Sequence, residues 1–400
     1  MARLEVLSIP IYYATMGAEY AHHRRRAANG VTTDGDYELK DTLTSLSMGG
    51  LSLLIPLVSP RLTRPLTPGK GRYGKYLVGG TIVAVAATTI ADAVVRRTND
   101  TATSPASDAE PDARSMARRK WRRIAQKVAR VGGVASIAGG VVAATTTWAN
   151  VIRPERMWAK RIVPDLGTGV VAWTTAIVGW DFLYYLNHRI WHSTRFMWAN
   201  HVMHHSSERY NLSTALRQAV TDPLLLPVPY TGLSLLGVRP ELVATSRSLN
   251  LLYQYWVHTD AIDRLGPFEE FANTPSHHRV HHGSDKRHID RNHGGILIVF
   301  DRLLGTFTRE DATPTYGLTK NINSFNPLRV ATHEYADILR DVAASDNWRD
   351  RLSFTFRGPG WAYERHRREA IAVVPVPDDH CTEVDTDSLV AGGELVAVTT

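Results

Sequence analysis

The sequence predicts an all-α integral membrane protein: a bundle of about four or more transmembrane or re-entrant helices, with a cytoplasmic helical cap that holds a histidine-rich site for two metal ions. Three observations support this prediction. Long apolar runs alternate with strongly basic segments. Several of these runs approach the roughly 20 residues that a helix needs to cross a bilayer. Most of the 17 histidines fall in short clusters between His188 and His293.

The first quarter of the chain contains two candidate spans. Residues 4–17 are apolar but short, and we expect them to lie in the membrane interface or to begin a helix. The segment His22-His23-Arg24-Arg25-Arg26 follows, and we expect it to form a solvated basic turn. Residues 44–60 form a marginal span, residues 61–75 a basic loop that contains Pro and Gly, and residues 76–95 a better span.

The middle of the chain supplies the remaining elements. Residues 96–125 are polar and basic, which predicts a flexible linker or a cytoplasmic basic segment. Residues 129–151 are rich in Ala, Gly and Val, which favours close helix packing in lipid. Residues 162–186 are apolar and lead into His188. Residues 219–238 are apolar but interrupted by prolines, and a membrane hairpin there would return the later histidines to the face of the earlier ones. Residues 241–257 predict a helix that ends at His258.

The composition restricts the class of protein. The net charge of +7 is typical of basic loops on the inner side of a membrane protein, and we favour this interpretation over nucleic-acid binding. The excess of Arg over Lys hints at a GC-rich bacterial source. Cys381 is the single cysteine, so neither a disulfide within one chain nor a thiolate metal site is expected. The N-terminus lacks the pattern of a signal peptide, and the acidic tail from about residue 370 is expected to be disordered.

The histidine clusters have helical spacing. Residues at i, i+3 and i+4 share one face of a helix, so each cluster can present its imidazoles to a common point. Eight imidazoles exceed the four to six ligands of one ion and suffice for two. His258 is a further candidate ligand, and His277 is an additional one. The three clusters are His188-Arg-Ile-Trp-His192, His201-Val-Met-His204-His205 and His278-Arg-Val-His281-His282.

All-imidazole ligation suits iron, zinc, copper or nickel rather than magnesium or calcium. Nitrogen-rich sites that keep an open coordination position can bind and activate oxygen. For any one cluster the alternative is a hydrogen-bonded group or a structural zinc site, but three clusters beside membrane-length helices favour a dimetal centre.

The clusters and their flanking segments resemble the fatty acid hydroxylase and sterol desaturase superfamily of integral-membrane di-iron oxygenases. All three boxes match the superfamily pattern, and the resemblance is strong over residues 178–318. It is closest to the branch of alkylglycerol-monooxygenase-like proteins, bacterial ones included. The segments that carry it are Asp181-Phe-Leu-Tyr-Tyr, His204 to Arg217, Tyr253-Gln-Tyr-Trp-Val-His-Thr, Asn273 to Gly283 and Asp301 to Phe307.

The resemblance implies an O2-dependent oxygenase that hydroxylates a C–H bond of a membrane lipid, whether ether lipid, sterol-like lipid or fatty acyl chain. Two iron ions are implied, with zinc as a substituting metal because imidazole binds both. The electron donor would be external: a cytochrome b5-like protein, a ferredoxin with its reductase, or a pterin. Tetrahydrobiopterin is left open, because Ser193 stands where the animal enzymes carry an acidic residue. The alternatives are a lipid or sterol desaturase on the same core, and a non-catalytic membrane protein with structural zinc. The expected ligands are His188, His192, His201, His204, His205, His258, His278, His281 and His282.

Three polar residues are expected to support the ligands. Asn292 would hydrogen-bond a ligand histidine, and Asp181 would pair with a basic or histidine side chain. Asp260 would do the same or cap a helix.

The resulting domain organisation places the histidine boxes on the cytoplasmic side of a bacterial cell membrane. It consists of membrane segments over 1–95, a polar basic linker over 96–125, a membrane hydroxylase domain over 126–335 with its core at 178–312, and a cytoplasmic C-terminal region over 336–400.

Overall fold

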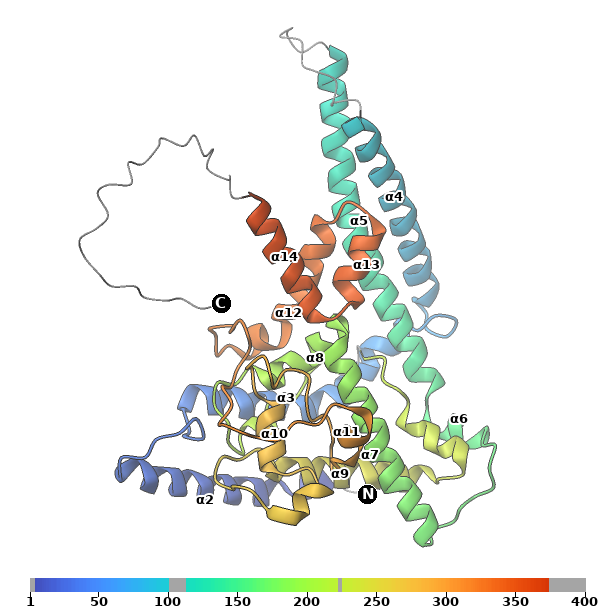
Figure 1. The fold of residues 1–400 in the computed structure, drawn as a ribbon. Coiled ribbons are helices and arrows are strands. Elements are labelled where there is room, and N and C mark those ends of the chain that lie inside the picture. The colour runs from blue at the N-terminus through green and yellow to red at the C-terminus, as the bar shows by residue number, and fades with distance from the viewer. Residues whose placement is uncertain (1–3, 101–112, 222–224, 374–400) are drawn as a thin grey trace, which may run out of the picture. The chain divides into compact units, whose positions relative to one another are not determined.

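The computed structural model describes residues 4–100, 113–221 and 225–373, and these residues are predominantly helical (Figure 1). Within these ranges no strand forms, and one isolated β-bridge joins Ala272 to Leu297. The all-α fold class predicted from the sequence is therefore confirmed. The described residues up to Pro359 form one compact unit, and the described residues from Gly360 to Val373 belong to a second.

The N-terminal part of the first unit contains the candidate membrane spans. Among the described residues, three stretches are long and apolar enough to cross a membrane: Leu39–Leu66, Gly74–Thr98 and Ala113–Val151. Together with the predicted spans, they indicate an integral membrane protein. The elements in this part are α1 (Leu4–Leu7), α2 (Ile9–Ala28), α3 (Leu39–Thr63), η1 (Arg64–Leu66), α4 (Gly74–Asp100), α5 (Ala113–Val151) and α6 (Pro154–Ala159).

Helices α4 and α5 lie side by side over most of their length (Figure 1). Small residues allow this approach. A Cβ atom added at Gly132 would lie 2.4 Å from Thr88 Oγ1, and one at Gly139 would lie 2.3 Å from Thr81 Oγ1. Near the other end of the pair, Ala and Val side chains of the two helices form a buried cluster: Ala91, Val95, Ala125 and Ala129.

Two sequence expectations for this region are wrong. Residues 96–125 are not a flexible linker at either end. Helix α4 continues to Asp100, and α5 begins at Ala113. Packing between α4 and α5 stabilises both helices here. Residues 101–112 lie outside the described residues. The expected basic turn at 22–26 is instead part of α2, and His23 is buried there, whereas His22 is exposed.

The second part of the first unit carries the histidine clusters. The helix predicted over 241–257 is confirmed as α9. A helical hairpin does not form in the described residues of 219–238. These residues form no regular secondary structure before the short 3-10 helix at Tyr230–Leu236, since Pro227 and Pro229 interrupt helical hydrogen bonding. The elements are α7 (Val170–Ser193), α8 (Arg195–His205), η2 (Thr214–Leu216), η4 (Tyr230–Leu236), α9 (Pro240–Trp256), η5 (Gly266–Glu270), α10 (Pro275–His281), α11 (Val299–Leu304), α12 (Pro327–Ala344) and α13 (Trp348–Phe356).

An apolar cluster, which we call the α7–α9 core, fixes α7 against η4 and α9. Its aromatic members are Trp180, which stacks on Tyr230 with ring centroids 4.3 Å apart, and Tyr184. Helix α7 therefore has an apolar half and a half that carries histidines. The buried residues of the α7–α9 core are Ala172, Ala176, Trp180, Tyr184, Leu233, Val238, Leu242 and Val243.

Helix α8 is anchored by buried charges. Arg195 at its first position donates from Nε to Glu334 and from Nη1 to Asp341, each at 2.6 Å, and both acceptors belong to α12. Apolar contacts that include Ile137 of α5 and Ala199 of α8 tie the same helices together. The orientation of α8 is therefore set by two neighbouring helices.

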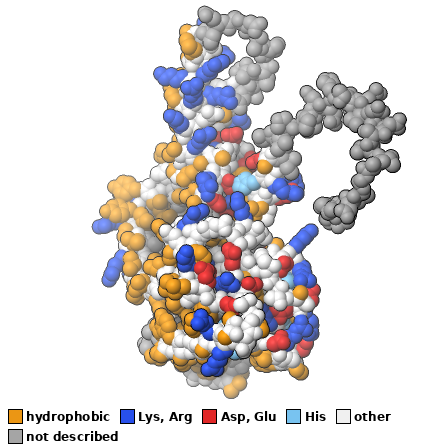
Figure 2. Space-filling view, turned by 90° about the vertical axis from the view of Figure 1, so that its left-hand side faces the viewer, with side chains coloured by type: hydrophobic (Ala, Val, Ile, Leu, Met, Phe, Trp, Pro, Cys, Tyr) orange, Lys and Arg blue, Asp and Glu red, His pale blue; other side chains and the backbone are white. Residues whose placement is uncertain are grey.

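Exposed apolar side chains mark the surface of the first unit. They are frequent on α3 and α4, as at Leu57 and Val83, and at the start of α7, as at Val170. Figure 2 shows hydrophobic side chains gathered along the left of its view and many Lys and Arg side chains in its upper part. Helix α14 (Pro359–Val373) belongs to the second unit from Gly360 onward. Residues 374–400, which include most of the predicted acidic tail, lie outside the described residues.

Candidate metal centre

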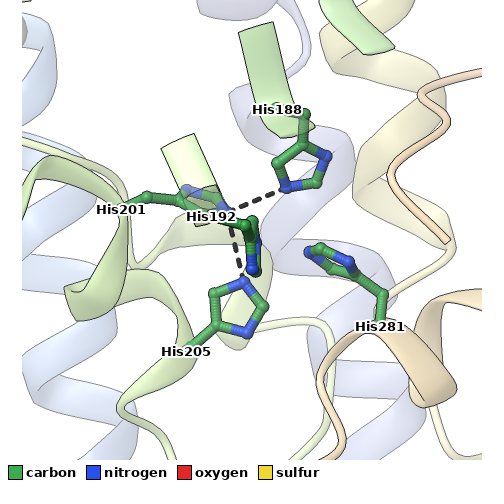
Figure 3. A group of neighbouring side chains, drawn as sticks. All are labelled: His188, His192, His201, His205 and His281. Atoms are coloured by element: carbon green, nitrogen blue, oxygen red, sulfur yellow. Dashed lines mark hydrogen bonds between the residues drawn. The ribbon is translucent and has the colours of Figure 1, made fainter. Parts of the chain in front are cut away.

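Nine predicted ligand histidines form two buried groups. In each group, one ring nitrogen per histidine lies within 4.8 Å of one nitrogen of every other member. Figure 3 shows the five rings of the first group, which α7, α8 and α10 contribute. The first group is His188, His192, His201, His205 and His281, and the second is His204, His258, His278 and His282.

Helix geometry divides the two HxxHH boxes between the groups. On α8, His201 and His205 are four residues apart and both belong to the first group, whereas His204 belongs to the second. The third box has the reverse arrangement: His278 and His282 belong to the second group and His281 to the first. Each HxxHH box thus contributes to both groups, whereas His188 and His192 both belong to the first group, so the sites are interlocked rather than built from separate segments.

Backbone carbonyls fix the orientation of three rings. The Nδ1 atoms of His188, His258 and His281 lie 2.9, 2.7 and 2.9 Å from the carbonyl oxygens of His293, Gln254 and Arg291. If each Nδ1 donates to its carbonyl, Nε2 carries a free lone pair. This is the usual arrangement of a metal-bound imidazole.

The donor set fits metal ions. In the first group His201 Nε2 lies 2.9 Å from His188 Nε2 and 3.1 Å from His205 Nε2 (Figure 3). In the second group His258 Nε2 lies 3.1 Å from His204 Nε2 and 3.0 Å from His278 Nε2. Further buried nitrogens have no hydrogen-bond partner among the described residues: the Nε2 atoms of His192, His281 and His282. Buried polar atoms are normally satisfied, and cations placed among these lone pairs would satisfy them.

Burial keeps these imidazoles neutral. It lowers the pKa of His201 to about 3 and the pKa of His258 to about 4. The pKa values of His188 and His282 fall well below the usual value, first through burial and then through neighbouring imidazoles. Neutral imidazole is the form that binds a metal, so the chain presents its ligands ready for binding at neutral pH.

The two groups are in contact. The rings of His205 and His282 stack with centroids 4.4 Å apart, and the centroids of His278 and His281 are 5.0 Å apart. Two ions bound in these groups would therefore share one buried space. On the surface side, Asp290 places Oδ1 3.4 Å from His192 Nδ1.

Asp181 and Asn292 act differently from their expected roles. Asp181 accepts hydrogen bonds from the amides of Ile296 and Leu297 and from Asn250, not from a basic or histidine side chain. Asn292 donates to the carbonyls of His277 and Thr308, and its backbone has a φ of 54°. Both residues hold the turn that contains His293. The carbonyl oxygen of His293 in turn lies within hydrogen-bond distance of His188 Nδ1. Their effect on the ligands therefore passes through the backbone.

The other two expected contributors lie outside the groups. His277 is buried but turns its ring toward Phe307, with centroids 5.3 Å apart. Because His277 directly precedes His278 in α10, its side chain leaves the helix in a different direction from that of His278. It belongs to neither group. Asp260 lies against Gly35 and His23 rather than against a box histidine. These positions support neither a ligand role for His277 nor a contact between Asp260 and a ligand histidine.

The sequence analysis missed a buried ion pair that supports the second box. Arg217 binds Asp41 of α3 and donates to Ser206 Oγ at 3.1 Å. Ser207 also donates to Asp41, at 2.8 Å. Because Ser206 and Ser207 directly follow His205, α3 is coupled to the ligands. The contact spans more than 160 residues, so no local pattern could reveal it.

Comparisons with known proteins agree with this site. Residues 173–306 match the fatty acid hydroxylase family. Over 189 residues, 47% of this chain, the sequence is 46% identical to alkylglycerol monooxygenase from Homo sapiens, of which it covers 42%. It is 43% identical to the Danio rerio protein of that name, with 51% of this chain and 45% of the relative aligned.

A more distant relative is the ornithine lipid hydroxylase of Rhizobium tropici, at 26% identity over 46% of this chain and 56% of the relative. The aligned region spans less than half the length of the alkylglycerol monooxygenases. No solved structure matches. The superfamily resemblance inferred from the boxes is confirmed.

Proposed function

From the premise that residues 173–306 form a fatty acid hydroxylase domain, we propose that this chain is an O2-dependent membrane di-iron oxygenase that hydroxylates a C–H bond of a lipid. The observation that carries the proposal is the pair of buried imidazole groups in contact with each other. We favour an ether lipid as substrate, because the relatives most similar in sequence are named alkylglycerol monooxygenases.

We assign the nine histidines as ligands of two iron ions, five on one ion and four on the other. The chemistry supplied by a bound iron pair is the activation of O2 for attack on an unactivated C–H bond. The reaction replaces C–H by C–O–H. One atom of O2 enters the lipid, the other leaves as water, and two electrons from a donor and two protons balance the reaction.

The chain itself orients and shields the site. Carbonyls of His293, Gln254 and Arg291 hold ring nitrogens of three ligands and direct their Nε2 atoms into the groups. Burial of the ligands, each of which is at most 9% exposed, limits the access of bulk water to the site. The apolar half of α7 begins at the exposed Val170 and ends beside His188, which suits a substrate that arrives from lipid.

We further propose that the boxes face the cytoplasm of a bacterial membrane and that electrons come from a cytochrome b5-like protein, a ferredoxin with its reductase, or a pterin. We keep the domain boundaries as a proposal, with the hydroxylase domain over 126–335; helix α5 (Ala113–Val151) crosses the first of these boundaries.

A direct test uses the full chain, purified in nanodiscs, loaded with iron and supplied with an alkylglycerol, O2 and a reductant. The expected product carries one added oxygen atom. A product that lacks two hydrogen atoms instead would favour the desaturase alternative.

The non-catalytic alternative predicts a different outcome. A protein purified from its native host with zinc alone, and without O2 uptake after iron loading in the presence of lipid, would favour a structural site. Iron content together with lipid-dependent O2 uptake excludes that alternative.

A further inference from the structure

Trp191 lies at the boundary between the α7–α9 core and the first histidine group. Its ring centroid is 5.4 Å from that of His201, 6.0 Å from His188 and 6.3 Å from Tyr184. The same side chain packs against the α7–α9 core. Trp191 therefore contacts both the candidate ligands and the α7–α9 core.

The indole nitrogen of Trp191 is a buried donor without an acceptor. Trp191 Nε1 has no hydrogen-bond partner among the residues that the structure describes. Indole nitrogen donates and never accepts, so a neighbouring lone pair would satisfy it. A buried donor left without a partner is costly, and each case in a folded protein calls for an explanation.

The surface of α7 suits the apolar part of a lipid. A shallow groove on the first half of α7 is lined by Val170, Trp173 and Ile177, and Trp173 packs against the same α7–α9 core as Trp191. The groove and Trp191 lie toward opposite ends of α7. Two hydroxyls on the neighbouring elements η4 and α9, Ser234 Oγ and Ser246 Oγ, are likewise buried without a partner in the described part of the chain.

We propose that Trp191 Nε1–H donates a hydrogen bond to an ether oxygen of the substrate, bonded to the carbon that is oxidised. This inference rests on the proposed function and specifies it: the substrate is a lipid with an acceptor oxygen beside the reacting carbon, not an unbroken alkyl chain. Trp191 is thereby a specificity-determining residue, because it positions the oxygen next to His188 and His201.

The test compares two lipids in two proteins. The lipids are an alkylglycerol ether and the matched diol in which a methylene replaces the ether oxygen. Trp191→Phe retains an aromatic ring and removes the N–H group. We expect the variant to lose about threefold to tenfold in kcat/KM on the ether, the value of one neutral hydrogen bond, and to retain its kcat/KM on the diol. An equal loss on both lipids, or no loss on the ether, would overturn the inference.

A binding measurement keeps the test independent of turnover. The affinity of each lipid is measured for the zinc-loaded full chain in nanodiscs. The wild type should bind the ether more tightly than the diol. Trp191→Phe should bind both lipids equally, with metal content unchanged. Equal affinities already in the wild type would contradict the inference. If the ether preference is found but the iron-loaded protein oxidises neither lipid, the proposed function fails while the oxygen-binding role stands.

Trp198→Phe is the matched control. Trp198 also contacts the first group, with ring centroids 4.9 Å from His192 and 5.4 Å from His205. Trp198→Phe should change kcat/KM, and likewise the affinity, by the same factor for the ether and the diol. A selective loss on the ether in this variant would show that the preference does not come from Trp191.

Discussion

Within each HxxHH box, the spacing of the histidines along the helix decides which group each imidazole joins. His201 and His205 reach one group together while His204 reaches the other, and His278, His281 and His282 are divided in the reverse sense. The two sites therefore share the HxxHH boxes. Loss of either HxxHH box would remove ligands from both sites.

Single ligand substitutions should separate the two groups. His192→Ala removes a ligand of the first group, and His258→Ala removes one of the second. Because loss of a ligand lowers the affinity of one ion most, we expect each variant to retain about one of two metal ions per chain. Elemental analysis of the purified protein measures this.

The double variant His204→Ala/His281→Ala takes one ligand from each group and should lose both ions. His333→Ala, which lies in α12 outside both groups, should retain both. Full metal occupancy in the double variant would refute the ligand assignment.

At the scale of helices, the α4–α5 pair depends on glycine at particular positions. A Cβ at Gly139 would lie 2.3 Å from Thr81 Oγ1, whereas one at Gly140 would meet nothing within 4 Å. Gly139→Ala should therefore lower the stability by about 1–3 kcal/mol through overpacking. Gly140→Ala should gain up to about 1 kcal/mol from helix propensity. Thermal unfolding in detergent measures both, and equal shifts would contradict the packing.

The buried ion pair between α3 and the segment after α8 should also be measurable. Asp41→Asn leaves Arg217 buried without its counter-charge, which costs about 3–5 kcal/mol. We expect a clear fall in the thermal midpoint. The exposed pair Arg239–Asp165 provides the control, and Arg239→Ala should change the midpoint little because water screens that pair. A similar fall in both variants would argue against the anchoring role of Asp41.

For the whole molecule, three helices indicate insertion into a bilayer rather than attachment to its surface. After alkaline carbonate extraction of membranes, the chain should remain in the pellet, detected by immunoblot. A peripheral protein is released by this treatment, and release of this chain would contradict integral insertion.

Much of this architecture could be predicted from local patterns. Apolar runs located α3, α4, α5 and α7, and histidine spacing identified the candidate ligands, since both signals are contained within one helix. The assignment of each histidine to a group could not be predicted, because it depends on how α8 and α10 face each other in space.

Long-range polar contacts were equally inaccessible. Asp181 binds backbone amides more than 100 residues away, and Arg217 pairs with Asp41 rather than with nearby Glu208. Burial of His23 depends on tertiary packing, which the basic composition of residues 22–26 does not reveal.

The most direct measurement of the central claim is the fate of O2. The iron-loaded full chain is incubated with an alkylglycerol, a reductant and O2 labelled with a heavy oxygen isotope, and the product is analysed by mass spectrometry. The account predicts one labelled oxygen atom in the lipid product. A product whose new oxygen comes from unlabelled water, or an unchanged lipid in the presence of two bound iron ions, would contradict it.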